Sequence, residues 1–278
     1  MNWLVVDKII ENALIEDCTY GDITTESIIS KESNSKADLI AKEEGIISGL
    51  EVFERVFSIL GDVRVKAFFK DGDLVKNKDI IGVLEGNTIN ILKGERVALN
   101  LMQRMSGIAT MTGKFLKEVS HTKAKILDTR KTTPNLRILE KYSVKIAGGT
   151  NHRFNLSDGI LIKDNHISAA GGIKKAILKA KSSCSFVRKV EVEVENLEGV
   201  LEAIEAGADI IMLDNMDLDS MKKAVKLIDG RALTEASGNV NIKTIKSIAE
   251  TGVDYISLGA LTHSFKSLDI SLKNLRNI

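Results

Sequence analysis

The chain has 278 residues, of which 44% are hydrophobic and 28% are charged, with 39 basic and 38 acidic side chains. Its formal net charge of +1 argues against a general binder of nucleic acids or anionic membranes, because such proteins need a net basic surface. The aromatic content of 4% is too low for a protein that stacks its side chains on single-stranded bases.

The cysteines and the lack of long apolar runs indicate the cellular compartment. Cys18 and Cys184 have no neighbouring Cys or His at metal-ligand spacing, which excludes a disulfide framework and a thiolate zinc site. Charged residues interrupt the segment 1–18, so we expect no signal peptide there. No apolar run approaches the roughly 18 residues that a membrane helix needs. We therefore expect a soluble, cytoplasmic protein.

The sequence up to about residue 105 mixes helix and strand patterns. Apolar residues near the N-terminus recur at helical spacing, and a second helical stretch starts at Gly94. Between them lie three short strand-like runs, at residues 37–41, 63–69 and 80–84. We expect a small α+β domain of the open-sandwich type over residues 1–108, with the C-terminal tail, residues 266–278, packing back on it.

From about Lys123 the sequence alternates between apolar strands and amphipathic helices. The strand candidates are residues 125–128, 159–162, 189–194, 210–213, 232–235 and 255–258. Two near copies, residues 206–209 and 251–254, each lead from a helix into a buried strand. Such a series of βα units predicts a parallel sheet covered by helices. We expect an incomplete TIM-like α/β barrel over residues 109–265. A doubly wound sheet is the alternative, although the first strand lacks its Gly-rich dinucleotide fingerprint.

Nearly every predicted strand of this second half ends in polar residues. In an α/β barrel the carboxyl ends of the strands converge on the active site. Four cations, together with His152, would face one pocket and repel one another unless an anionic ligand neutralised them. They are Arg130, Lys131, Arg153 and Lys163. The sequence therefore predicts a substrate with several negative groups. The alternative is pairing of each cation with local acids at the surface.

Two acids end neighbouring strands on the opposite side of the predicted pocket. Glu193 and Asp214 there suit a Mg²⁺ ion or ribose hydroxyls beside a phosphate. Glu191, Glu193 and Glu195 alternate along one strand, so a plain solvent-exposed edge is the other interpretation.

Small residues end the last two strands, at 237–239 and 259–260. They allow backbone N–H groups to approach a phosphate, which barrels often bind after their last strands. His121, His166 and His263 lack ligand spacing, and we interpret each as a structural or surface histidine. No nucleophile with an adjacent base stands out.

These residues lie in motifs that resemble the quinolinate phosphoribosyltransferase family, also called nicotinate-nucleotide pyrophosphorylase (carboxylating). The motifs are residues 16–17 with 21–25, 94–96 with 99–100, 106–110, 127–134, 148–153, 163–166, 213–215 and 235–239. The resemblance spans nearly the whole chain. One departure is Asn239, where many members carry Gly, and both residues tolerate a left-handed backbone.

The resemblance implies that quinolinate and 5-phosphoribosyl 1-pyrophosphate give nicotinate mononucleotide, pyrophosphate and CO₂, with Mg²⁺. It implies a homodimer in which the N-terminal domain of one subunit closes the barrel mouth of the other, so that Arg96 acts in trans. Quinolinate would contact Arg96, Arg130, His152, Arg153 and Lys163. The phosphoribosyl substrate would contact Lys131, Glu193, Asp214, Ser237, Gly238, Asn239, Leu258, Gly259 and Ala260. Thr129 would also bind substrate. Lys131, Glu193 and Asp214 would be catalytic, and the two acids would hold the metal directly or through substrate.

Four alternatives stay open at this point. A paralogue associated with molybdenum uptake shares the fold, and a non-decarboxylating nicotinate phosphoribosyltransferase would use a related acceptor. A barrel aldolase would use Lys131 or Lys163 as a Schiff base. A non-catalytic phosphate-binding module would leave the cationic pocket without a purpose.

The single proline, Pro134, follows the cationic segment 130–131. Its fixed φ would stiffen the turn after that segment. The alternative is an ordinary proline at a helix start before Asn135.

Overall fold

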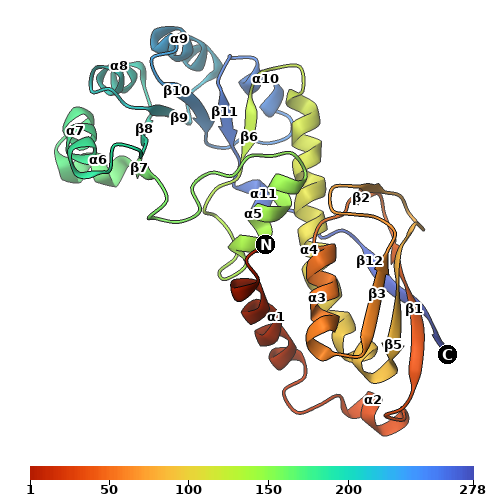
Figure 1. The fold of residues 1–278 in the computed structure, drawn as a ribbon. Helices are drawn as coiled ribbons and strands as arrows, with labels where there is room; N and C mark the ends of the chain where they lie inside the picture. Colours follow the sequence, from red (N-terminus) through yellow and green to blue (C-terminus); the bar gives the residue numbers. More distant parts are fainter. The chain divides into compact units, whose positions relative to one another are not determined.

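The structure is a computed structural model that describes residues 1–278, and it divides into two compact units. Unit 1 comprises Met1–Gly113, Thr132–Gly148 and Ser264–Ile278, and unit 2 comprises Lys114–Lys131 and Gly149–His263. The long helix α4 (Thr88–Val119) contributes to both units (Figure 1). None of the helices is both long and apolar enough to cross a membrane.

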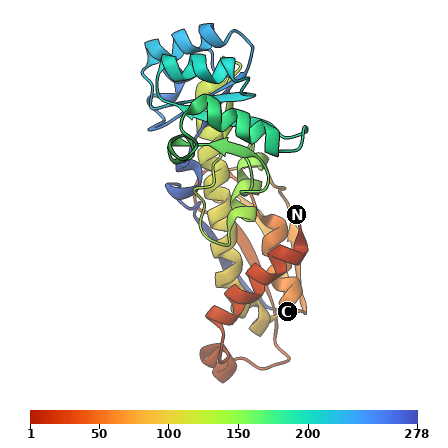
Figure 2. The ribbon, with the colours of Figure 1, turned by 90° about the vertical axis from the view of Figure 1, so that its left-hand side faces the viewer.

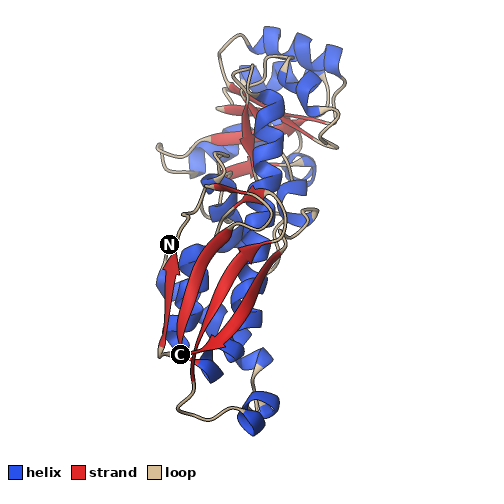
Figure 3. Cartoon of the chain, turned by 90° about the vertical axis from the view of Figure 1, so that its right-hand side faces the viewer, coloured by secondary structure: helices blue, strands red, loops and turns tan.

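Unit 1 is built on a four-stranded antiparallel sheet with the strand order β12-β1-β5-β3 (Figure 3). The strands are β1 (Asn34–Ala41), β3 (Val63–Ala67), β5 (Ile80–Asn87) and β12 (Ile270–Asn277). The C-terminal strand β12 pairs with β1 from Ser35 opposite Asn277 to Ala41 opposite Ile270. A separate two-stranded ribbon joins β2 (Gly45–Ile46) to β4 (Leu74–Val75).

Most helices of unit 1 form one hydrophobic core with this sheet. They are α1 (Trp3–Asp17), α3 (Leu50–Leu60), the first part of α4, and α5 (Arg137–Ile146). The short helix α2 (Ile23–Ile28) contributes no apolar side chain to this core. In α3, Phe53 and Phe57 are fully buried and pack edge to face, with ring centroids 5.2 Å apart. Unit 1 is thus the predicted α+β layer structure.

The start of α4 differs from the prediction. The helix begins at Thr88 rather than Gly94, because the Asn87 side chain accepts a hydrogen bond from the Asn90 N–H and caps the first turn. Gly94 lies inside the helix, where a Cβ atom would come within 2.8 Å of Phe57 and Leu60. This glycine therefore allows close packing of α4 on α3 and does not mark a helix start.

Unit 2 contains a six-stranded parallel sheet with the order β6-β11-β10-β9-β8-β7. The strands are β6 (Lys125–Leu127), β7 (Ile160–Ile162), β8 (Val190–Val194), β9 (Ile210–Asp214), β10 (Leu233–Ser237) and β11 (Tyr255–Ser257). Strands β7 to β11 are neighbours in chain order, without the reversal of a doubly wound sheet. Because β6 and β7 do not pair, the barrel is incomplete, as the sequence predicts.

Helices on the outside of this sheet complete the βα units. The longer ones, α7 (Ile173–Ser183), α8 (Leu197–Glu205) and α9 (Leu218–Ile228), pack side by side (Figure 2). Three shorter helices follow strand ends or connect strands: α6 (Asp164–Ala170), α10 (Ile245–Ala249) and α11 (Ala260–His263). The loops that carry the polar motifs therefore lie at the carboxyl ends of the strands.

Pro134 lies in a turn that precedes α5 and is not the first residue of that helix. The Leu136 N–H donates to the Thr133 carbonyl oxygen, and Asn135 has a φ of 66°. Proline at the second position and a left-handed residue at the third define a type II turn. The helix-start interpretation is therefore wrong, because α5 begins only at Arg137.

Candidate active site

The carboxyl ends of the barrel strands enclose a polar cavity of about 570 Å³, which we call the upper pocket. Its lining residues come from the strand ends and the loops after them: Thr129, Lys131, Lys163, Glu193, Asp214, Asn215, Ser237, Gly238, Asn239, Val240, Ser257, Leu258, Gly259, Ala260 and His263. This is the end of the fold at which α/β-barrel enzymes hold their substrates.

An ion pair and a chain of amides order the acidic side of the upper pocket. Lys163 Nζ lies 2.5 Å from Glu193 Oε2, with Glu193 largely buried. The Asn215 side-chain amide donates to Asp214 Oδ2 at 2.7 Å, and the Asn239 amide donates to Asn215 Oδ1 at 3.1 Å. Asn239 has a φ of 50°, so it adopts the left-handed backbone that its substitution for Gly requires. These bonds connect the ends of β9 and β10.

A smaller cavity of about 140 Å³, the cationic pocket, adjoins the upper pocket and shares lining residues with it. Its charged lining comprises Arg130, Lys131, His152, Arg153, Lys163 and Glu235. Burial lowers the pKa of the Arg153 guanidinium, and the neighbouring Arg130 lowers it further, while Glu191 acts in the opposite direction. Several cationic side chains therefore line one cavity, and an anionic ligand would relieve their mutual repulsion.

Asp128 positions the loop that carries two of these cationic side chains. The carboxylate is fully buried at the end of β6. Its Oδ1 accepts from the His152 backbone N–H at 2.9 Å, and its Oδ2 accepts from the Asn151 side-chain amide at 2.6 Å. Hydrogen bonds to an ionised group are among the stronger ones in proteins, so Asp128 ties the segment 151–153 to the sheet.

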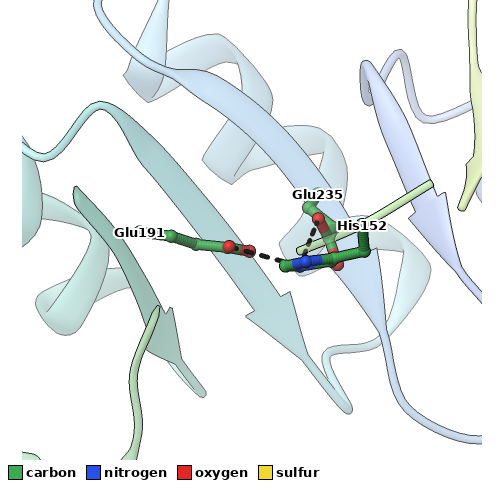
Figure 4. A group of neighbouring side chains, drawn as sticks. All are labelled: His152, Glu191 and Glu235. Carbon is green, nitrogen blue, oxygen red and sulfur yellow. Dashed lines mark ion pairs between the residues drawn. The ribbon is translucent and has the colours of Figure 1, made fainter. Parts of the chain in front are cut away.

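Beneath the cationic pocket, His152 contacts two buried glutamates, Glu191 on β8 and Glu235 on β10 (Figure 4). His152 Nε2 lies 3.2 Å from Glu191 Oε2 and 3.6 Å from Glu235 Oε2. Burial raises the pKa of Glu235 to about 8, and the Glu191 carboxylate adds to the rise, while His152 opposes it. Glu191 is only 4% exposed, so the interpretation of the 191–195 alternation as a solvent-exposed edge is wrong at this position.

The same three side chains have ligand atoms within 4.8 Å of one another, which is close enough to hold a metal ion. The orientation of the imidazole argues against this use. His152 Nδ1 accepts the Arg153 backbone N–H at 2.6 Å, so in the neutral ring the proton is on Nε2. Nε2 is then a donor toward the glutamates and has no lone pair for a metal. The positions of His152, Glu191 and Glu235 suit proton transfer among the three side chains better than metal binding.

Of the residues expected to form the site, all but Arg96 lie in unit 2, and each of these lines the upper or the cationic pocket. Arg96 is exposed on α4 in unit 1. His166 is structural, as predicted, because its Nδ1 accepts the Lys163 backbone N–H. His121 lies at the surface, 3.2 Å from Glu250.

Four polar residues of the two pockets were not predicted from the sequence: Asn215, Glu235, Ser257 and His263. Asn215 and Glu235 lie within the family motifs at strand ends, so position in the barrel is the signal that could have identified them. No sequence pattern identifies Ser257 or His263 as a pocket residue. They reach the pocket only because β11 is followed directly by the short helix α11.

An α/β barrel whose strand ends combine cations, carboxylates and small residues is typical of enzymes that bind phosphate-containing substrates. The match to known families is more specific. The quinolinate phosphoribosyl transferase N-terminal domain matches residues 22–106 and its C-terminal domain matches residues 108–273. The chain belongs to the quinolinate phosphoribosyl transferase family.

Relatives in bacteria and plants are similar over almost the whole chain. A Bacillus subtilis protein named "Probable nicotinate-nucleotide pyrophosphorylase (carboxylating)" is 47% identical over 98% of this chain and 94% of its own length. The mitochondrial quinolinate phosphoribosyltransferase (decarboxylating) 2 of Nicotiana glauca is 45% identical over 96% of this chain and 81% of its own. Among solved structures, NadC from Streptococcus pyogenes is 46% identical with a TM-score of 0.97, covering 100% of this chain and 99% of that one.

Proposed function

We propose that this chain transfers phosphoribosyl from 5-phosphoribosyl 1-pyrophosphate to quinolinate with decarboxylation, giving nicotinate mononucleotide, pyrophosphate and CO₂ for NAD biosynthesis. The observation that carries the proposal is the pair of adjoining pockets. One is cationic and small enough for a dicarboxylate, and the other is larger and lined by acids and small residues that suit a ribose phosphate. Membership of the family supports the same reaction.

The residues divide between the two substrates according to the pocket that they line. Arg130, His152, Arg153 and Lys163 would bind the quinolinate carboxylates. Lys131 would contact the pyrophosphate-bearing substrate, and Glu193 and Asp214 would contact its ribose hydroxyls. The backbone around Gly238 and Gly259 would receive the 5′-phosphate, because no Cβ atom blocks the approach there. The Lys163–Glu193 ion pair holds both side chains in place until substrate competes for them.

Mg²⁺ fits the acidic side of the upper pocket. The carboxylates of Glu193 and Asp214 lie among amides and hydroxyls, and hard oxygen donors of this kind are the ligands that Mg²⁺ prefers. These two residues would hold the ion directly or through substrate. A bound ion would neutralise part of the negative charge on pyrophosphate.

The chemistry follows from where charge develops. Departure of pyrophosphate leaves positive charge on the ribose ring, which the carboxylates of Glu193 and Asp214 stabilise. The quinolinate nitrogen attacks the anomeric carbon. Loss of CO₂ from the 2-carboxylate then leaves an electron pair on C2, beside the cationic ring nitrogen and within the cationic pocket. No covalent enzyme intermediate is required.

The decisive experiment incubates the protein with quinolinate, 5-phosphoribosyl 1-pyrophosphate and Mg²⁺ and measures pyrophosphate and CO₂. We expect one CO₂ per pyrophosphate, and no reaction in the absence of quinolinate. A Lys131→Ala variant should lose both products. Turnover of nicotinate without CO₂ release would instead assign the chain to the non-decarboxylating reaction, and binding of quinolinate without turnover would contradict the proposal.

The active unit would be a homodimer in which Arg96 of one subunit reaches the cationic pocket of the other. Two features of unit 1 support this. Arg96 is exposed on α4, and several large apolar side chains of α1, α2 and the segment between them are exposed at the surface. They are Leu4, Ile15, Tyr20, Ile23 and Ile28. Burial of these side chains against a partner subunit would remove apolar surface from water.

A further inference from the structure

The proposed reaction requires a proton that neither substrate delivers. When the bond between C2 and the 2-carboxylate breaks, CO₂ leaves without charge and the electron pair remains on C2. C2 must then take a proton to give nicotinate mononucleotide. Until the proton arrives, CO₂ that is still in the pocket can recombine with C2. A proton held near the pocket is therefore part of catalysis. This inference rests on the proposed function.

The cationic pocket has one buried carboxyl group in its lining. Glu235, on β10, is 2% exposed and lines this pocket. It also lines a second cavity of about 360 Å³, which we call the lower cavity and which begins among the first residues of the barrel strands. Glu191 lines the lower cavity but not the cationic pocket. Of the two glutamates, Glu235 therefore faces the position of the substrate.

The surroundings of Glu235 favour a protonated carboxyl group. The Glu191 carboxylate is adjacent, and two buried carboxylates cannot both be ionised at low cost. His152 Nε2 is nearer to Glu191 Oε2 than to Glu235 Oε2, so it compensates Glu235 less. Oε1 of Glu235 accepts no hydrogen bond from the protein. Oε1 of Glu191 is unpaired as well, and both atoms are shielded from solvent.

We propose that Glu235 is the general acid that protonates C2 after CO₂ has left. The O–H bond of the Glu235 carboxyl breaks, its proton forms the new C2–H bond with the electron pair on C2, and Glu235 becomes a carboxylate. The new carboxylate lies 3.6 Å from His152 Nε2. A water-borne proton entering through the lower cavity then restores the acid. The cycle needs no further reactant.

The lower cavity provides the route for this proton. Its lining includes Ile210, Leu233 and Tyr255, each the first residue of its strand, together with Glu191, Glu235 and His152. The proton supply thus comes from the amino ends of the strands, while the substrates lie at the carboxyl ends. Reprotonation of Glu235 does not require the substrate pockets to open.

The test replaces Glu235 with Gln, which keeps the size of the side chain and cannot donate the proton. Single-turnover reactions with quinolinate, 5-phosphoribosyl 1-pyrophosphate and Mg²⁺ are followed separately for pyrophosphate, CO₂ and nicotinate mononucleotide. For Glu235→Gln we expect pyrophosphate release near the wild-type rate and product formation slower by roughly 100-fold, with quinolinate mononucleotide accumulating. Glu235→Asp, which keeps an acid, should recover part of the product rate. Glu195→Gln, an exposed change on the same segment as Glu191, should match the wild type.

A second readout identifies the donor directly. In an equal mixture of H₂O and D₂O, the H/D ratio at C2 of the product reflects the group that delivers the proton. We expect this ratio to differ between wild type and Glu235→Gln and to be similar in wild type and Glu235→Asp. Equal ratios in all three proteins, an unchanged product rate in Glu235→Gln, or an equal loss of pyrophosphate release and product would overturn the proposal. If the wild type releases no pyrophosphate with quinolinate, the proposed function itself fails.

Discussion

Asp128 shows how one buried residue can control substrate binding without touching substrate. Its two oxygens accept from the His152 N–H and from the Asn151 amide. In Asp128→Asn, one acceptor becomes an NH₂ group that faces a donor. We expect the free energy of unfolding to fall by about 2 kcal/mol, the cost of losing a hydrogen bond to a buried charged group. We also expect KM for quinolinate to rise more than kcat falls, because the segment 151–153 shifts. Urea unfolding and steady-state kinetics measure the two effects.

Asp217→Asn is the matched control for this change. Asp217 caps α9 by accepting from the Asp219 and Ser220 N–H groups and lies at the surface. Asn caps helices about as well as Asp, so we expect little loss of stability and an unchanged KM. If Asp128→Asn and Asp217→Asn behave alike, the buried hydrogen bonds of Asp128 do not position the loop.

For single residues, the sequence predicts which residue types form the site better than it predicts how their side chains are oriented. Strand-end position is enough to bring Lys163 and Glu193 together, because parallel strands end at one edge of the sheet. It cannot show that His152 points both ring nitrogens into the protein, because a backbone N–H and two carboxylates determine that rotamer. The raised pKa of Glu235 is likewise a result of burial beside Glu191 and His152, which come from two other segments.

Among the elements, the near copies at residues 206–209 and 251–254 repeat a structural role. Each ends in an aspartate whose side chain accepts a backbone N–H at the start of the neighbouring strand. Asp209 accepts from Val190 at 2.8 Å, and Asp254 accepts from Thr234 at 2.9 Å. Asp254 accepts also from the Thr234 hydroxyl and from Lys123. Both aspartates therefore connect neighbouring strands at their amino ends, the face of a barrel that contributes to stability.

This geometry predicts a pH-dependent loss of stability in Asp254→Asn. Burial raises the pKa of Asp254, but hydrogen bonds from Lys123 and Thr234 outweigh it and hold the pKa below its usual value. A carboxyl group whose pKa is lower in the folded protein stabilises the fold fully above the pKa of the unfolded chain, which is about 4. This contribution is lost as the pH falls from there through the pKa of the folded protein. We expect Asp254→Asn to cost about 2 kcal/mol at pH 7 and progressively less below pH ~5. Denaturant unfolding from pH 7 down to pH 3.5 measures the difference.

Asp209→Asn is the comparison within the repeat. Asp209 makes one side-chain bond to the backbone and lies 3.8 Å from Lys181, so its loss should be smaller than that of Asp254→Asn. Neither variant should change KM for either substrate, since both residues lie at the amino ends of the strands. A pH-independent cost in Asp254→Asn would contradict the assigned role of its charge.

The boundaries of the elements were predictable where a periodic pattern ends in a turn, and not where side-chain caps decide. The strands of unit 2 start and end within two residues of their predicted positions. The start of α4 was missed because Asn87 caps it six residues before the Gly94 signal. Such a cap depends on one local hydrogen bond, which hydrophobic periodicity does not encode.

For the whole molecule, the division into units follows from chain order only in part. The strand β12 comes after the barrel in sequence and belongs to the sheet of unit 1, where the tail 266–278 was expected to pack. The segment Thr132–Gly148 also leaves the barrel sequence to join unit 1, and alternation of βα units does not predict this, because it depends on contacts between residues far apart in the chain. Arg96 lies in unit 1, and the barrel residues of the site lie in unit 2.

This separation leads to a prediction about the assembly. If Arg96 acts on the pocket of a partner subunit, Arg96→Ala and Lys131→Ala should each be inactive alone and should complement each other when mixed. In a mixed dimer, one pocket combines an intact Lys131 with an intact partner Arg96, and the other pocket lacks both. After subunit exchange at equal amounts, half of the dimers are mixed and each has one working site, so about a quarter of the wild-type activity should return. No recovery, with subunit exchange verified by differently tagged chains, would show that each subunit builds its site alone.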